Sequence, residues 1–165
     1  MPLVKAFLKK LKSKGARIVV DSRSFTLDDL KEVKPWLIKP NSEEIAVYSG
    51  KKVISFSDCL DFAKKLVLDG IENVMISLGE KGALLVTEDE CMTAVPPKIN
   101  ALSTIGAGDS TIAGFIAAYA DGFDAAECLK VAISYGTAAC LERGTTPPTK
   151  ENAEKIYKNT KIETM

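Results

Sequence analysis

Seven consecutive residues in the last third of the chain combine two glycines with a single carboxylate. They read Thr104-Ile105-Gly106-Ala107-Gly108-Asp109-Ser110. The segment that they open is rich in small residues, and we predict a helix over about 108–120. Two glycines let the backbone turn tightly and leave room for a ligand, and the free amides at a helix start favour anions. The stretch therefore predicts a site for phosphate oxygens.

Asp109 is the unexpected member of this stretch, because a carboxylate beside an anion site repels phosphate. It fits if it faces a hydroxyl group that attacks the phosphate. Phosphoryl transfer needs only a group that orients this hydroxyl and accepts its proton late. On these residues alone an ordinary Asp N-cap after a glycine turn is an equally open interpretation.

A second polar segment follows a predicted strand over 36–38 and reads Lys39-Pro40-Asn41-Ser42-Glu43-Glu44. Asn41 and Glu44 could order Mg²⁺ and its water molecules against a phosphate. The same spacing also forms a capping box, which needs no ligand. Lys39 could neutralise a phosphate or could simply be solvated.

A third segment follows a predicted strand over 74–78 and reads Ser77-Leu78-Gly79-Glu80-Lys81-Gly82. It could be a turn between two strands that uses glycine for positive φ. It could also be a loop that contacts a nucleotide at the carboxyl edge of the sheet.

The rest of the chain alternates helical patterns with short, continuously apolar strands, which indicates an α/β fold with a mainly parallel, Rossmann-like sheet. The predicted helices cover residues 3–14, 26–33, 41–48, 57–69, 108–120, 124–141 and 150–158. The predicted strands cover residues 16–20, 36–38, 74–78, 83–86 and 91–95.

The composition excludes several classes of protein. The 22 basic residues balance 22 acidic ones, so there is no global field for nucleic acid or an anionic membrane. Histidine is absent and the four cysteines are scattered, which excludes histidine-dependent catalysis and argues against a zinc site. No apolar run approaches the roughly 20 residues of a membrane span. We expect a cytoplasmic protein.

Two familiar nucleotide motifs are also missing. The chain has neither a G-x-x-x-x-G-K-[ST] loop nor a G-x-G-x-x-G stretch after its first strand. The absence of the second disfavours a nucleotide-binding regulator of the dinucleotide type.

Taken together and in this order, the three polar segments resemble the ribokinase-like (PfkB) carbohydrate kinases, nearest to the 1-phosphofructokinase and tagatose-6-phosphate kinase branch. The resemblance extends over about residues 9–157. It implies transfer of the γ-phosphate of ATP, with Mg²⁺, to a hydroxyl group of a sugar phosphate such as fructose 1-phosphate or tagatose 6-phosphate.

The resemblance also implies a role for individual residues. Asp109 would be the catalytic base, and the amides of Gly106, Ala107, Gly108 and Asp109 would bind the transferring phosphoryl group. Asn41 and Glu44 would organise Mg²⁺ through water. The residues along the ATP phosphates and ribose would be Lys39, Ser77, Gly79, Gly82 and Gly108, and the residues along the adenine would run from Ser134 to Ala138.

The chain departs from the family in two ways. Relatives carry, before the point equivalent to Met1, another half that holds sugar-contacting residues and a β-sheet lid used in dimer contacts. They also usually have a glycine after the serine where this chain reads Asp21-Ser22-Arg23-Ser24. We therefore expect residues 1–165 to be one domain, the C-terminal nucleotide-binding part of a homodimeric kinase. A non-catalytic truncated α/β module, or a half-enzyme that needs a separate N-terminal partner, stays open.

Overall fold

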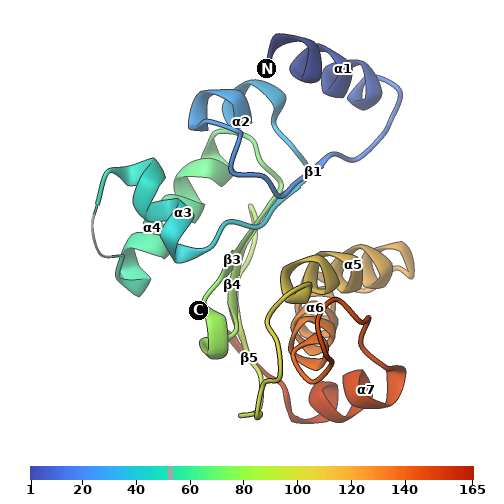
Figure 1. The fold of residues 1–165 in the computed structure, drawn as a ribbon. Coiled ribbons are helices and arrows are strands. Elements are labelled where there is room, and N and C mark those ends of the chain that lie inside the picture. Colours follow the sequence, from blue (N-terminus) through green and yellow to red (C-terminus); the bar gives the residue numbers. More distant parts are fainter. Residues whose placement is uncertain (52–53) are drawn as a thin grey trace. The chain divides into compact units, whose positions relative to one another are not determined.

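The computed structural model describes residues 1–51 and 54–165 (Figure 1). The chain divides into two compact units. The first unit comprises residues 1–77 and 84–91, and the second comprises residues 78–83 and 92–165.

The first unit repeats a pattern of strand, helix and parallel strand. Its elements are α1 (Pro2–Lys12), β1 (Val19–Val20), α2 (Leu27–Val33), β2 (Leu37–Ile38), α3 (Ser42–Ser49), α4 (Phe56–Leu68) and β3 (Asn73–Ser77). Val19 lies opposite Leu37, and Leu37 lies opposite Asn73, in parallel register. Parallel neighbours need long crossovers, and the helices supply them. The carboxyl ends of β1, β2 and β3 therefore share one edge.

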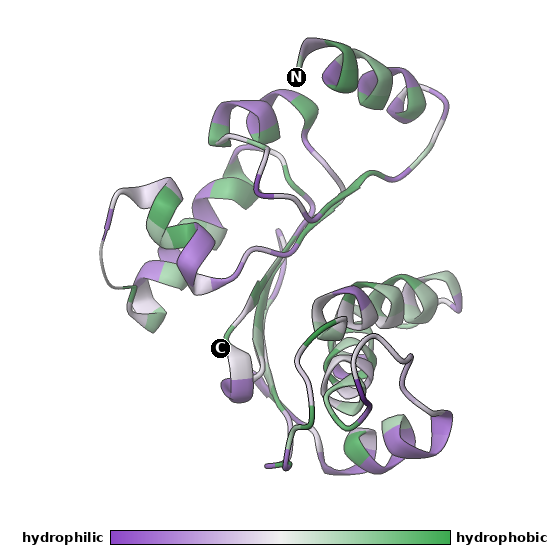
Figure 2. Cartoon of the chain, in the orientation of Figure 1, coloured by the Kyte–Doolittle hydropathy of each residue, from purple (hydrophilic) through white to green (hydrophobic). Residues whose placement is uncertain are grey.

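The starts of three helices in this unit are set by capping boxes. Thr26, Asn41 and Ser55 each accept a hydrogen bond from a backbone N–H three residues later, and the acid at that position accepts one in return. These caps satisfy amides that have no partner inside a helix. The core beneath them is apolar, and the strands stand out as hydrophobic in Figure 2.

The second unit is built on small residues. Its helices are α5 (Ala107–Ala120), α6 (Ala125–Ala139) and α7 (Lys150–Asn159). A Cβ placed on Gly114 would lie 3.1 Å from Ala132 Cα, so α5 and α6 approach each other closely. Close packing of this kind needs residues without long side chains.

The last element of the second unit is a short strand that was not predicted from the sequence. β6 (Lys161–Thr164) pairs antiparallel with β5 (Cys91–Val95), with Met92 opposite Thr164. The strands belong to one sheet in the order β1-β2-β3-β4-β5-β6, where β4 spans Ala83–Val86. The α/β fold is thus confirmed, with a sheet that is mixed because of β6.

The predicted helices and strands all appear, with shifted ends. The largest change is at β1, which covers two residues where a strand over 16–20 was expected. Within the described residues, no helix has both the length and the apolar character needed to cross a membrane.

Candidate functional site

The start of α5 is an unusual helix end. Its N-cap is Gly106, which has φ 81°, and no side chain caps the helix. Nothing lies within 4 Å of a Cβ placed on Gly106, so a side chain would meet no steric clash there. Glycine is favoured at this position because of its positive φ. The open space leaves the helix start accessible to a ligand.

Two backbone donors at this start have no partner among the residues that the structure describes. Ala107 N–H donates to Thr104 O at 3.3 Å, and Ser110 N–H donates to Gly106 O at 2.9 Å. Within the described part of the chain, no hydrogen bond involves the N–H groups of Gly108 or Asp109. Unpaired first-turn amides at the positive end of a helix are suited to an anion.

The Asp109 side chain is exposed and has no hydrogen bond or ion pair among the described residues. The alternative that it caps α5 is wrong, because the cap position belongs to Gly106 and Asp109 lies inside the first turn. Its carboxylate is therefore free to accept a hydrogen bond from a ligand.

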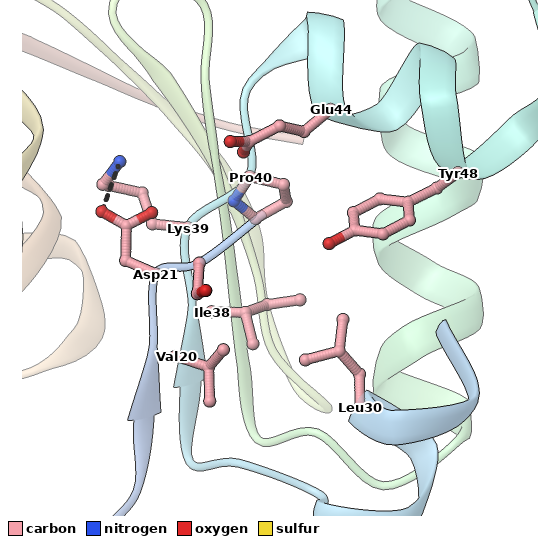
Figure 3. A pocket seen from close by; sticks show the side chains of 9 residues that line it. Val20, Asp21, Leu30, Ile38, Lys39, Pro40, Glu44 and Tyr48 are labelled. Atoms are coloured by element: carbon pink, nitrogen blue, oxygen red, sulfur yellow. Dashed lines mark ion pairs between the residues drawn. The ribbon is translucent and has the colours of Figure 1, made fainter. Parts of the chain in front are cut away.

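At the carboxyl ends of β1 and β2, Asp21 and Lys39 form an ion pair (Figure 3). Lys39 Nζ lies 3.4 Å from Asp21 Oδ2, and the lysine is only 8% exposed. The alternative that Lys39 is simply solvated is therefore wrong. The sequence analysis did not predict Asp21 as a site residue. A usable signal was present, because Asp21 directly follows the first predicted strand just as Lys39 directly follows the second.

Asn41 and Glu44 form the capping box that their spacing allows. Asn41 Oδ1 accepts from Glu44 N–H at 2.9 Å, and Glu44 Oε2 accepts from Asn41 N–H at 3.1 Å. The other carboxylate oxygen of Glu44 accepts from Arg23 Nε at 3.1 Å. Arg23 is a second neighbour that sequence reasoning missed.

These contacts limit how the pair could serve a metal ion. Asn41 Oδ1 and both carboxylate oxygens of Glu44 each accept one N–H hydrogen bond. Each of these oxygens keeps a lone pair that can accept a hydrogen bond from a metal-bound water molecule. Within residues 1–51 and 54–165, no three His, Cys, Asp or Glu side chains gather as a direct ligand set. The residues thus fit a hydrated Mg²⁺ that is held mainly by phosphates, the way this ion usually binds.

A small pocket lies beside these groups, lined by Asp21, Lys39, Glu44 and Tyr48 among others (Figure 3). Its volume of about 10 Å³ is close to what one water molecule needs. Tyr48 donates its hydroxyl to Phe25 O at 3.0 Å, and burial with the nearby Glu44 carboxylate raises its pKa. Tyr48 is therefore a neutral wall of the pocket.

Ser77 lies at the end of β3 and joins the same edge of the first unit. Its N–H donates to Pro40 O at 3.0 Å, and it forms an isolated parallel bridge with Asn41. The structure thus brings Lys39, Asn41, Glu44 and Ser77 to the carboxyl ends of neighbouring strands.

The loop after Ser77 is a tight turn whose two glycines have positive φ, 63° at Gly79 and 89° at Gly82. Its middle is a short 3₁₀ helix, Gly79–Lys81, and Leu78 N–H donates to Gly82 O at 2.8 Å. A Cβ on Gly82 would lie 1.8 Å from Ala94 O, so its glycine is needed for packing. The turn interpretation is confirmed, and a nucleotide contact by this loop stays a prediction.

Ser134 and Ala138 lie in the packed interior of the second unit. Ser134 is 1% exposed and donates its hydroxyl to Lys130 O at 2.6 Å, and Ala138 is fully buried. Burial favours packing as the role of both side chains. Their predicted position along the adenine stays a prediction.

Comparisons with known proteins agree on one family. A family model described as pfkB family carbohydrate kinase matches residues 3–152. The 1-phosphofructokinase of Vibrio cholerae is 32% identical over 138 residues, which cover 84% of this chain and 44% of that protein. The 1-phosphofructokinase of Haemophilus influenzae is 37% identical over 127 residues, 76% of this chain and 41% of that protein.

A solved structure shows the same fold. Phosphofructokinase-2 from Escherichia coli, in complex with substrates and products, matches with a TM-score of 0.85 and 28% identity. The match covers 95% of this chain and 52% of that chain. The chain therefore spans about half the length of the relatives that it matches.

Proposed function

The chain belongs to the PfkB family of carbohydrate kinases, and from this premise we propose that it holds the nucleotide and phosphoryl-transfer half of a sugar-phosphate kinase. The observation that carries the proposal is the start of α5, where unpaired amides stand beside a free carboxylate. This arrangement suits a phosphoryl group that is attacked by a hydroxyl group.

In this proposal the N–H groups of Gly106, Gly108 and Asp109 bind the transferring phosphoryl oxygens. The Ala107 N–H joins them when it gives up its 3.3 Å hydrogen bond to Thr104 O. Fixed dipoles that face the developing charge stabilise the transition state. Asp109 orients the attacking hydroxyl and accepts its proton. A carboxylate at a helix start is a weak base, which is sufficient because the proton moves late in phosphoryl transfer.

The first unit supplies the charge that faces the nucleotide phosphates. Lys39 exchanges its Asp21 partner for a phosphate oxygen, and Ser77 lies next to it along the same edge. Asn41 and Glu44 hold water molecules of a Mg²⁺ ion. When bound, Mg²⁺ neutralises phosphate charge.

The proposed acceptor is a phosphorylated ketose of the fructose 1-phosphate or tagatose 6-phosphate type. The names of the curated relatives favour fructose 1-phosphate. We further propose that the whole kinase works in the cytoplasm as a homodimer.

Nucleotide binding by the chain itself is the first test. Thermal unfolding followed with ADP and Mg²⁺ at up to millimolar concentration should show a rise in Tm, because a ligand that binds only the folded state stabilises it. Fructose 1-phosphate alone should change the Tm little. If ADP and Mg²⁺ leave the Tm unchanged, the chain is better described as a non-catalytic α/β module.

A further inference from the structure

Arg23 is a cationic residue at the proposed phosphate edge to which the proposed function gives no role. It lies just after β1, and its Nε donates a hydrogen bond to Glu44 Oε1 at 3.1 Å. Among residues 1–51 and 54–165, no hydrogen bond or ion pair involves either of its Nη atoms. Because a guanidinium carries most of its N–H donors on these two atoms, Arg23 keeps most of its donors free.

Glu44 is a well-fixed anchor for this arginine. Its second carboxylate oxygen accepts from Asn41 N–H, and its own N–H donates to Asn41 Oδ1. The Glu44 side chain is 19% exposed, whereas the Arg23 side chain is 76% exposed. The Nε of the guanidinium is therefore held while its Nη edge is open to solvent. Two Nη atoms side by side match the spacing of two phosphate oxygens.

A second cation lies beside the same anchor. Lys39 and Glu44 line one pocket at the carboxyl ends of the strands, and Lys39 is paired there with Asp21. In Figure 3 the Glu44 carboxylate points away from Tyr48, toward the side where Lys39 and Asp21 lie. Arg23 is thus tethered at the rim of the pocket whose other cation is Lys39.

We propose that Arg23 is a further nucleotide-binding residue, which bridges Glu44 and a phosphate group of the nucleotide. Its Nε stays on Glu44 while the Nη atoms donate to phosphate oxygens. The inference rests on the proposed function, because it requires the nucleotide phosphates to lie at this edge. Arg23 gains a second anion without losing its first, whereas Lys39 has to leave Asp21.

Competition with a metal ion is the opposing interpretation. Arg23 and the water molecules of a hydrated Mg²⁺ could both use Glu44, and Arg23 would then hinder metal-dependent binding. Glu44 Oε1 keeps a lone pair beside the Arg23 bond, so it can serve both partners at once. The spare acceptor favours the bridge. The two interpretations predict opposite effects when the arginine is removed.

The test is the affinity of the chain for ADP with Mg²⁺, taken from the rise of Tm with ADP concentration. Arg23→Gln should weaken binding about fivefold, which is less than the loss expected for the buried Lys39, because an exposed charge is screened by solvent. Lys9→Gln is the matched control. It removes a cation from another exposed ion pair, with Glu32 at 2.7 Å, and should bind ADP like the wild type.

The same substitution in a Glu44→Gln background tests the anchor. Glutamine can still form the capping box, so α3 keeps its start. Without the carboxylate Arg23 is no longer held, and Arg23→Gln should then weaken binding only about twofold or less, as coupled neighbours do. An equal loss in both backgrounds would show that Arg23 acts through its charge alone and would overturn the bridge.

The remaining outcomes separate this inference from the proposed function. Tighter binding by Arg23→Gln would establish competition with Mg²⁺ and overturn the bridge, as would an unchanged affinity. If Lys39→Met weakens binding and Arg23→Gln does not, only the Arg23 inference fails. If the wild type binds no ADP at any Mg²⁺ concentration, the proposed function fails and the Arg23 inference fails with it.

Discussion

Gly136 of α6 lies where that helix comes closest to α5. A Cβ on Gly136 would be 2.0 Å from Thr111 Oγ1, a distance that real atoms do not adopt. Thr111 is held in place, since its hydroxyl donates to Ala107 O at 2.8 Å. We expect Gly136→Ala to lower the free energy of unfolding by about 1–3 kcal/mol through overpacking. Urea unfolding measures this.

The Thr111→Ala background provides the control for this prediction. Removal of Oγ1 takes away the closest contact, so Gly136→Ala should cost clearly less there. A coupling of this kind is what neighbouring residues show in a double-mutant cycle. An equal loss in both backgrounds would mean that the hydroxyl is not the obstacle.

Lys39 has the most enclosed cationic side chain of the proposed site, with 9% side-chain exposure against 31% for its partner Asp21. Lys39→Met should weaken binding of ADP with Mg²⁺ by roughly tenfold or more, since a hydrogen bond to a charged group is worth about 1.5–3 kcal/mol. Isothermal titration gives the affinity. Lys31→Met removes a comparable ion pair, with Asp69 at 3.2 Å, and should leave the affinity unchanged.

At the scale of elements, the sequence was most informative where a pattern was strong and local. Apolar runs such as residues 74–78 and 83–86 predicted buried strands, and the spacing of Asn41 and Glu44 predicted the cap that the structure contains. β6 was not predicted because its four residues are largely exposed and show only a weak alternation of apolar and polar side chains. Its strand structure depends on pairing with β5.

The site was harder to predict than the fold because its contacts join separate elements. Asp21 and Lys39 are 18 positions apart and meet only because β1 and β2 are parallel neighbours. Arg23 reaches Glu44 across a similar separation. The burial of Ser134 depends on how α6 packs, which helical periodicity alone does not determine.

The α1–α2 contact makes stability depend on pH. Lys5 Nζ lies 2.8 Å from Asp29 Oδ1, and together with hydrogen bonds from Thr26 it lowers the Asp29 pKa to about 2. A carboxylate with a lowered pKa contributes stability above its unfolded pKa, and this contribution disappears as the pH falls through the folded value. The wild type should therefore be more stable than Asp29→Asn at pH 7.

This difference should be constant from pH 7 to about 5, shrink below about pH 4 and be largely lost by pH 2. Urea unfolding of both proteins across this range measures it. Asp28→Asn is the matched control, because Asp28 is the neighbouring acid in the first turn of α2 but does not form the capping box. A difference that stays constant down to pH 2 would contradict the assigned role of the Asp29 charge.

At the scale of the whole molecule, nucleotide binding and sugar-phosphate turnover are expected to depend on different parts of the kinase. The chain matches relatives about twice its length, and Asp109 lies in the first turn of α5. We therefore expect nucleotide affinity to be a property of this chain, and turnover of a sugar phosphate to depend on the part of the relatives that this chain does not span. Asp109 is the residue at which the two properties can be tested against each other.

Asp109→Asn should bind ADP with Mg²⁺ as tightly as the wild type or a few-fold more tightly, because it removes a negative charge beside the phosphate site. Turnover of fructose 1-phosphate by the whole kinase should fall about 10²–10⁴-fold, the usual contribution of a general base. Asp121→Asn, at the other end of α5, should change neither quantity. Weaker nucleotide binding together with unchanged turnover would show that Asp109 serves the nucleotide and that the base must be sought elsewhere.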